Sequence, residues 1–343
     1  MPEMPPVGIA LIGCGRISGA HLAAAMAVPD AVRIVATVDL DPAAAQKAAA
    51  PFGAFALTSL DEALALPDVE AVLISSPNAL HGEQALAALA AGRHALVEKP
   101  LAETGAQARM LASEAARHGL VLAAGHTYRH NAAVATLIDR MADWGPLRAV
   151  SVSSCVFWDG PQAPWWATRS PEEGLILSLF APHSLDFVQL VMGADDPLRV
   201  HAEAARWQPG WAGEDEAMIT LAYPGRRMAS VHISYNQRSV FDRKVLHFAQ
   251  GVAEIVDGEV LKWNGEVLVS PPEGVLVNPR QMGGRRMGHF FEQQLREFAA
   301  AVRGAPHRCP TGHDAARLIE LIDRIKASAR ANSADAIDPP FEG

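Results

Sequence analysis

The chain has 343 residues, of which 50% are hydrophobic and 20% charged, so it is long enough for two domains with separate apolar cores. Its net charge of −9, without any lysine- or arginine-rich block, argues against nucleic acid or an anionic membrane as the main partner. The three scattered cysteines indicate neither a disulfide framework nor a CxxC metal site, and a cytoplasmic location fits them best. No signal peptide or membrane-spanning run is recognisable. We therefore expect a small molecule as the main partner.

The first predicted element is a buried strand from residue 7 that leads into the turn GCGRISG and then into a helix. Gly13 suits the tight turn after the strand, and Gly15, which has no Cβ, lets a pyrophosphate approach the backbone. The helix that follows offers unpaired N–H groups to phosphate charge. Ser18 replaces the third glycine of the usual pattern, with Gly19 one place later. The turn predicts the start of a dinucleotide site.

A second apolar run, over residues 33–38, ends at Asp39. A carboxylate at this place can accept hydrogen bonds from both ribose hydroxyls of a dinucleotide. Leu40 and Asp41 follow and offer no positive charge to a 2′-phosphate, so we expect NAD rather than NADP. The alternative for Asp39 is an ordinary strand-end or helix-capping carboxylate, but the upstream turn favours dinucleotide binding.

Short apolar runs alternate with helical patterns through about residue 125. Asp41 and Pro42 are expected to open a helix, and Ser59 with Glu62 has the spacing of a capping box. The other predicted elements are strands over residues 71–75, 94–98 and 121–124 and helices over residues 81–91 and 104–118. This alternation predicts a doubly wound α/β domain of the Rossmann type over residues 1–125, with ligands at the carboxyl ends of its parallel strands.

The pattern changes after a helical segment at residues 132–141, and strand-like runs with short turns follow. They cover residues 147–158, 198–207, 217–223, 228–236, 244–249, 253–256 and 259–263, with helical segments at 175–192 and within 287–331. We expect residues 126–343 to form an α+β domain with a large, mostly antiparallel sheet that helices cover on one face. The open face is expected to be covered by a second subunit in a homodimer or homotetramer.

Several motifs occur in order along the chain: GCGRISGAH, the acidic Asp39, SPNALH at residues 76–81, AGRHALVEKPLA at 91–102 and PHSLD at 182–186. Together they resemble the glucose-fructose oxidoreductase, inositol dehydrogenase and rhizopine catabolism (Gfo/Idh/MocA) family of NAD(P)-dependent oxidoreductases, over nearly the whole chain. The resemblance implies hydride transfer between nicotinamide and a secondary alcohol of a sugar, cyclitol or related cyclic diol. It implies cofactor contacts from Gly13, Gly15, Arg16, Ile17, Asp39, Ser76, Pro77, Asn78, His81, Glu98 and Lys99.

Lys99, in the EKP motif, is the residue to which the resemblance assigns the main chemical role. An ammonium beside the nicotinamide can bind the substrate oxygen and stabilise the negative charge that develops there as hydride leaves carbon. The alternative is a surface lysine at the end of a strand. The resemblance also implies a cis peptide bond between Lys99 and Pro100.

His183 is the second residue to which the resemblance assigns chemistry, as a general base or proton relay. We expect it to face Lys99 across one cleft beside the cofactor. The sequence departs from the family pattern four residues earlier, where Leu179 stands in place of an aspartate. This departure suits a substrate with fewer hydroxyls or one bound in another orientation. The alternative for His183 is a core or capping histidine.

Arg129 and Tyr128 in HTYRHN, together with Trp166 and His183, are the predicted substrate-binding residues. An interdomain salt bridge is an equal alternative for Arg129, and burial at a domain interface is the alternative for Trp165 and Trp166. The remaining histidines lack ligand-like spacing, so no metal site is predicted. Two other functions stay open. One is a redox-neutral NAD-dependent glycosidase, or an aldehyde or imine reductase, and the other is a regulatory protein that senses dinucleotide or sugar without turnover.

Overall fold

The computed structural model describes residues 5–161, 166–167, 174–271 and 288–332. The described residues of Met1–Asn131 and Met282–Ile319 form one compact unit, and those of Ala132–Gln281 and Glu320–Gly343 form a second. The sequence-based division assigned everything after residue 125 to the second domain. The structure instead packs helix α9 and the start of α10 with the first unit, because apolar side chains of both helices join its core.

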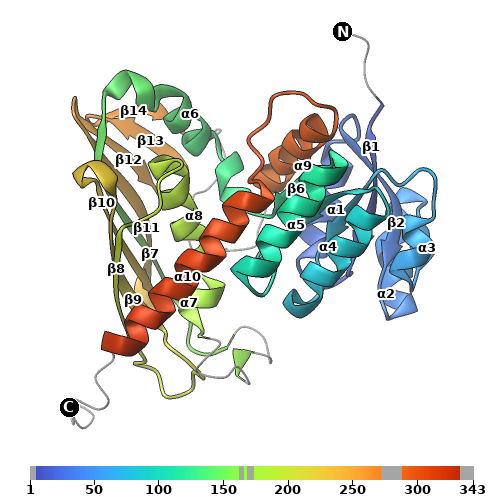
Figure 1. Cartoon of the computed structure of the whole chain (residues 1–343), viewed down its shortest axis with the longest axis horizontal. Helices are drawn as coiled ribbons and strands as arrows, with labels where there is room; N and C mark the ends of the chain where they lie inside the picture. Colours follow the sequence, from blue (N-terminus) through green and yellow to red (C-terminus); the bar gives the residue numbers. More distant parts are fainter. Residues whose placement is uncertain (1–4, 162–165, 168–173, 272–287, 333–343) are drawn as a thin grey trace. The chain divides into compact units, whose positions relative to one another are not determined.

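The first unit contains a six-stranded parallel sheet with strand order β3-β2-β1-β4-β5-β6. Its strands are β1 (Val7–Ile12), β2 (Val32–Val38), β3 (Phe55–Leu57), β4 (Ala71–Ile74), β5 (His94–Val97) and β6 (Leu122–Ala124). Its helices are α1 (Ser18–Ala27), α2 (Pro42–Ala49), α3 (Leu60–Leu64), α4 (His81–Ala90), α5 (Gly105–His118), α9 (Gly288–Val302) and the first part of α10 (Gly312–Asn332). The predicted doubly wound fold is therefore confirmed (Figure 1).

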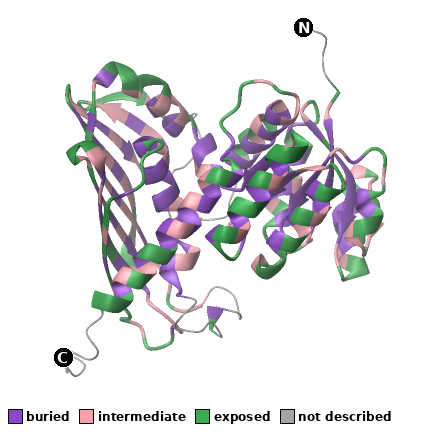
Figure 2. Ribbon diagram, viewed as in Figure 1, coloured by how far each residue is buried: buried purple, intermediate pink, exposed green. Residues whose placement is uncertain are grey.

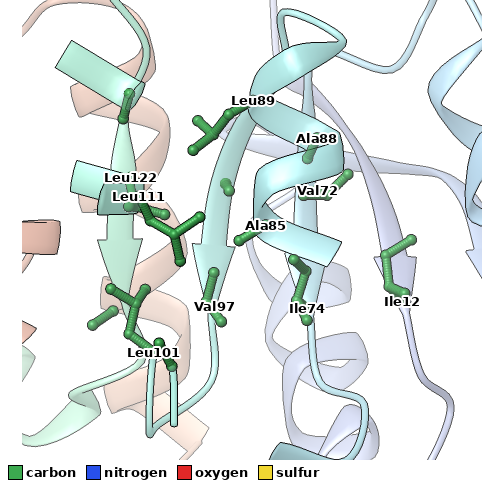
Figure 3. Packing of buried hydrophobic residues seen from close by; sticks show 14 of the residues in the cluster. Ile12, Val72, Ile74, Ala85, Ala88, Leu89, Val97, Leu101, Leu111 and Leu122 are labelled. Atoms are coloured by element: carbon green, nitrogen blue, oxygen red, sulfur yellow. The ribbon is translucent and has the colours of Figure 1, made fainter. Parts of the chain in front are cut away.

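Helices cover both faces of this sheet because successive residues of a strand point to opposite sides. Ala10 and Ile12 of β1 join a core cluster with α4 and α5, whereas Ile9 and Leu11 join another cluster with α1 and α9. Figure 3 shows the first of these clusters, with α4 lying over β4 and β5. Strands buried on both faces explain why these segments read as continuous apolar runs.

The helix ends of the first unit follow the sequence signals with one exception. Asp41 caps α2 by accepting a hydrogen bond of 2.9 Å from Ala43 N, and Pro42 is the first residue of the helix. The predicted capping box at Ser59 and Glu62 is wrong, because the Ser59 side chain makes no capping hydrogen bond. The spacing of the two residue types does not determine the rotamer of the serine, and α3 is only five residues long.

The second unit contains an eight-stranded sheet with strand order β14-β13-β12-β11-β7-β10-β9-β8. Its strands are β7 (Leu147–Phe157), β8 (Arg199–Ala205), β9 (Glu216–Ala222), β10 (Met228–Ser234), β11 (Asn236–Phe248), β12 (Val252–Val256), β13 (Val260–Trp263) and β14 (Glu266–Val269). Its helices are α6 (Ala132–Arg140), α7 (Ile176–Leu179), α8 (Ala181–Met192) and the last part of α10. The predicted mostly antiparallel sheet is confirmed, although β10 pairs with β7 in parallel and β14 was not predicted.

The two faces of this second sheet differ, as the alternating sequence pattern indicates (Figure 2). On β10, Ala229, Val231 and Ile233 are buried on the face where α8 packs. Met228, on the other face of β10, is 58% exposed, and Met218 of β9 is 56% exposed on the same face. Within one chain, large apolar side chains therefore remain accessible on one face of this sheet.

Candidate active site

The turn after β1 holds the first residues of the site. Gly13 has a φ of 88°, which favours glycine, and a Cβ at this position would lie 2.6 Å from Ser76 N and 2.7 Å from Ser76 Cα. The Ser75 hydroxyl donates a hydrogen bond of 2.8 Å to Gly13 O. The absent side chain therefore allows the turn after β1 to pack against the loop after β4.

Gly15 lies in the same turn, but the surrounding protein atoms do not require a glycine there. A Cβ at Gly15 would meet no atom within 4 Å. The Ser18 hydroxyl donates a hydrogen bond of 2.5 Å to Gly15 O, and Ser18 is buried while Gly19 is exposed. Ser18 therefore takes the packing position of the missing third glycine. The space beside Gly15 fits the close approach of a pyrophosphate.

Asp39 follows β2, and its carboxylate accepts a hydrogen bond from the backbone of this turn. Its Oδ2 atom accepts a hydrogen bond of 2.7 Å from Cys14 N, and its Oδ1 atom accepts one of 2.9 Å from Asp41 N. An ionised carboxylate has about four acceptor sites, so two remain for ribose hydroxyls. Burial and the charge of Asp39 raise the pKa of the Cys14 thiol to about 11, despite a hydrogen bond with Thr37. Cys14 therefore stays a thiol near neutral pH.

The loop after β4 leads through a short 3-10 helix, Asn78–Leu80, into α4. Pro77 is exposed and Asn78 is half-buried. His81, the first residue of α4, is 1% exposed, and its ring nitrogens lie 2.7 Å from Pro100 O and 2.9 Å from Ser76 O. The imidazole therefore connects the loop after β4 with the loop after β5, which is a structural role.

Lys99 lies directly after β5, and the predicted cis peptide bond between Lys99 and Pro100 is confirmed. The side chain keeps part of its surface accessible, although protein atoms surround much of it. Desolvation by burial lowers the pKa of Lys99, the charge of Glu98 opposes this, and the charge of Arg16 lowers the pKa further. The net result is an amine with a pKa below its ordinary value at the carboxyl edge of the sheet.

Glu98 lies beside Lys99 and is 9% exposed. Its Oε1 atom lies 2.8 Å from His21 Nε2, and its Oε2 atom accepts a hydrogen bond of 3.1 Å from Lys99 N. Burial opposes ionisation, but the hydrogen bond and charge of His21, with smaller contributions from Lys99, outweigh it, so the pKa of Glu98 lies below its ordinary value. A buried carboxylate anion therefore stands next to the lysine.

His21 was not singled out from the sequence, so its contact with Glu98 was missed. The available signal was the spacing of Ser18 and His21, three residues apart on one face of α1. Both are buried, and Ser18 holds the glycine turn. Within the first unit, the described residues thus bring the turn, Asp39 and Lys99 to the carboxyl ends of β1, β2 and β5.

The segment after β6 contains Tyr128 and Arg129 in a short 3-10 helix, Thr127–His130. The Arg129 guanidinium is 7% exposed and lies 3.7 Å from an Asp314 carboxylate oxygen. Both residues belong to the first unit, so this ion pair is not an interdomain bridge. The Tyr128 ring lies 5.8 Å from the ring of Phe290. These contacts give both side chains a structural role, and their contact with substrate stays a prediction.

The second unit carries His183 in the first turn of α8. His183 is half-buried, while the neighbouring residues of this helix are buried. Leu179, the last residue of α7, is also half-buried. Trp166 is 8% exposed and packs with the rings of Trp158 and Trp211, so burial within the second unit accounts for it. Trp165 lies outside the described residues.

In the described parts of the chain, no group of three or more histidine, cysteine, aspartate or glutamate side chains is placed to hold a metal ion. No helix in these parts is long and apolar enough to span a bilayer. Within the first unit, the site is formed by the glycine turn, the strand-end residues Asp39, Glu98 and Lys99, and the buried histidines His21 and His81.

Family models match both parts of the chain. Residues 7–126 match the model of an oxidoreductase family with an NAD-binding Rossmann fold, and residues 133–254 match the GFO/IDH/MocA C-terminal domain. The 1,5-anhydro-D-fructose reductase of Ensifer adhaerens is 29% identical over 289 residues, which cover 81% of this chain and 83% of the relative. The inositol 2-dehydrogenase of Ralstonia nicotianae is 29% identical and covers 96% of this chain and 95% of its own.

A solved structure has the same fold over most of the chain. GenD2 from gentamicin A biosynthesis, in complex with NAD, has a TM-score of 0.79 and 24% identity, with 96% of each chain covered. The matches to both family models, together with this fold, show that the chain belongs to the Gfo/Idh/MocA family of NAD-binding oxidoreductases.

Proposed function

We propose that this enzyme is an NAD-dependent dehydrogenase that transfers hydride between the nicotinamide and a secondary alcohol of a sugar, cyclitol or related cyclic diol. The observation that carries the proposal is that the Lys99 amine has a lowered pKa and lies at the carboxyl ends of the parallel strands, where the glycine turn and Asp39 also lie. The names of the relatives, a reductase of an anhydrosugar and a dehydrogenase of inositol, support this substrate class.

The residues of the first unit fit NAD. The open space beside Gly15 and the N-terminus of α1 suit the pyrophosphate. The remaining acceptor sites of Asp39 suit a ribose diol, and the carboxylate would repel a 2′-phosphate. Leu40 is 89% exposed and offers apolar surface for the adenine ring. When bound, NAD supplies the nicotinamide carbon that accepts the hydride.

In this proposal, Lys99 and His183 have different acid–base roles. The Lys99 ammonium donates a hydrogen bond to the substrate oxygen and stabilises its developing negative charge. His183 accepts or relays the hydroxyl proton, and its place in the first turn of α8 exposes the imidazole to the positive end of the helix dipole. Leu179 removes a hydrogen-bond acceptor one turn earlier, which favours a substrate with fewer hydroxyls.

The glycine turn gives a test of cofactor placement. Replacing Gly15 by alanine is expected to weaken NAD binding at least tenfold, about 1.4 kcal/mol, because the new methyl group meets only the ligand. Gly19→Ala is the matched control, since a Cβ there also meets no atom within 4 Å. Calorimetric titration with NAD measures both, and thermal melting checks that both fold. Equal NAD affinity of Gly15→Ala and the parent would contradict the placement.

The proposed activity is tested with purified protein and NAD across a panel of inositols, aldoses, glycosides and aromatic cis-diols. We expect NADH to accumulate with at least one cyclic polyol or related diol. Glycoside hydrolysis without net NADH would instead identify a redox-neutral glycosidase. NADH consumption with aldehydes or imines but no alcohol oxidation would identify a reductase, and saturable binding without any absorbance change would identify a sensor.

We further propose a cytoplasmic homodimer or homotetramer formed through the open face of the second sheet. Met218, Met228 and Phe241 lie on this face and are 56%, 58% and 45% exposed. Covering such side chains in a partner interface is favourable. Sedimentation equilibrium should give two or four times the 36.5 kDa chain mass, and the double variant Met218→Lys, Met228→Lys should sediment as a single chain. A monomeric parent would refute the proposal.

A further inference from the structure

His21 and Glu98 form a buried polar pair that connects two parts of the first unit. His21 lies on α1, the helix that begins at the glycine turn, and is 1% exposed. Its Nε2 atom lies 2.8 Å from Glu98 Oε1, while Glu98 Oε2 accepts the backbone N–H of Lys99 at 3.1 Å. One carboxylate therefore connects the helix after the dinucleotide turn with the backbone of the lysine.

The hydrogen-bonding pattern assigns the proton of this pair. An ionised carboxylate only accepts hydrogen bonds, so His21 Nε2 carries the hydrogen. The other ring nitrogen, Nδ1, is buried without a hydrogen-bond partner among the described residues. The ring also packs edge-on against Phe291, with centroids 4.8 Å apart. The contact with Glu98 is thus the polar interaction that distinguishes this histidine from an apolar residue of similar size.

Gly125, after β6, limits the position of Glu98 from another side. A Cβ at Gly125 would lie 3.0 Å from Glu98 Cα and 3.3 Å from Glu98 Cδ, tighter than most real contacts. Gly125 N also donates a hydrogen bond of 2.7 Å to Val97 O. The backbone after β6 therefore packs directly on the glutamate, whose carboxylate is held between this backbone and His21.

The contribution of this pair to the free energy of folding does not by itself account for its presence. Removing a carboxylate and an imidazole from water costs free energy that a buried pair does not reliably recover, and apolar side chains of similar volume often stabilise a fold as well. A buried pair that fixes a neighbouring functional group has a different benefit, because it holds that group in one geometry and one charge environment.

We propose that His21 is a positioning residue for Lys99 and acts through the Glu98 carboxylate. The inference deepens the proposed function, because it depends on the role of Lys99 in hydride transfer. His21 keeps Glu98 ionised and oriented, and Glu98 in turn holds the Lys99 backbone and supports its ammonium form. Two charged groups near Lys99 act in opposite directions on its pKa, since Glu98 raises it and Arg16 lowers it.

The test compares His21→Leu, which removes the donor, with His21→Gln, whose amide keeps an N–H near the position of Nε2. The first readout needs no substrate. Brief acetylation with acetic anhydride at a series of pH values, followed by peptide mass spectrometry, gives the pH midpoint of Lys99 labelling in each protein. The exposed Lys47 of α2 is the internal reference. Glu98→Gln, which removes the carboxylate charge with little change of shape, is the second line of test.

In the parent, Lys99 should be labelled at lower pH than Lys47. His21→Leu and Glu98→Gln should each move the pH midpoint of Lys99 labelling to still lower pH, since the neighbouring negative charge is lost. Each substitution should also reduce kcat at least tenfold, whereas the Kd for NAD should change less than about threefold. His21→Gln should stay close to the parent. These differences would not arise from a merely structural role, which would lower the melting temperature and leave the midpoint unchanged.

The outcomes separate the two proposals. Unchanged turnover in Lys99→Ala would overturn the proposed function of Lys99 itself, whatever the labelling midpoints are. A lowered parent midpoint that does not move in folded His21→Leu would overturn the role of His21 and leave the proposed function standing. If His21→Leu does not fold, the pH midpoint of Lys99 labelling in Glu98→Gln decides the role of the carboxylate. If folded His21→Gln loses as much turnover as Glu98→Gln, the role of His21 is overturned.

Discussion

Lys99→Ala should reduce turnover at least ~100-fold, the usual scale for loss of an acid–base or electrostatic group. The variant loses the donor that stabilises negative charge on the substrate oxygen. NAD affinity should be nearly unchanged, because the pyrophosphate and ribose contacts come from the turn after β1 and from Asp39. Stopped-flow absorbance at the nicotinamide band measures turnover, and calorimetry measures NAD binding. Unchanged turnover in Lys99→Ala would remove the lysine from the mechanism.

The pH profile adds a second, signed readout to this variant. The ammonium is the form that donates, so activity should fall as pH rises through the pKa of Lys99, which burial places below its ordinary value. Arg16→Gln removes a positive charge that lowers this pKa, so the falling limb should move to higher pH. In Lys99→Arg the limb should disappear from the accessible range, because a guanidinium stays charged. A limb unaffected by both substitutions would belong to another group.

His183→Asn carries the second large expected effect, a loss of roughly 100-fold in turnover, because asparagine keeps a polar side chain but cannot take up the hydroxyl proton. The substrate KM should change less than kcat. His201→Asn is the matched control, since His201 belongs to β8 of the same unit and its side chain is 57% exposed. Its turnover should stay within about twofold of the parent.

Chemical rescue distinguishes a proton-transfer role of His183 from a packing role. His183→Ala should regain part of its turnover when imidazole is added, since a small base can enter the space left by the side chain. A core or capping histidine would give an unstable variant without rescue. Loss of turnover that follows the loss of thermal stability and does not respond to imidazole would therefore support the packing alternative.

The sequence predicted the first unit well where its signals are local. The turn around Gly13, the cap at Asp41 and the end of α5 at Gly119 each depend on residues close in the chain, whose conformational preferences act within a few positions. The short strand β3 was missed, because an apolar run that contributes only three residues to a strand is too short to indicate one by itself, and these residues are half-buried or exposed.

The remaining features depend on contacts between distant residues. The pairing of His21 with Glu98 joins residues 77 positions apart, and the parallel pairing of Ser230 with Ser151 joins distant strands. Composition and periodicity say which face of an element is buried, not which partner covers it. The ion pair of Arg129 with Asp314 could not be predicted for the same reason, since it depends on the packing of the start of α10 within the first unit. The meeting of Lys99 and His183 across a cleft stays a prediction.

The central claim is direct hydride transfer with the help of Lys99, and isotope transfer tests it most directly. The substrate that produces NADH is prepared with deuterium on its carbinol carbon, and the reduced cofactor is analysed by mass spectrometry. We expect one deuterium per NADH in the parent and formation of the labelled cofactor at least ~100-fold slower in Lys99→Ala. Unlabelled NADH in the parent, or equal rates in the parent and the variant, would contradict the account.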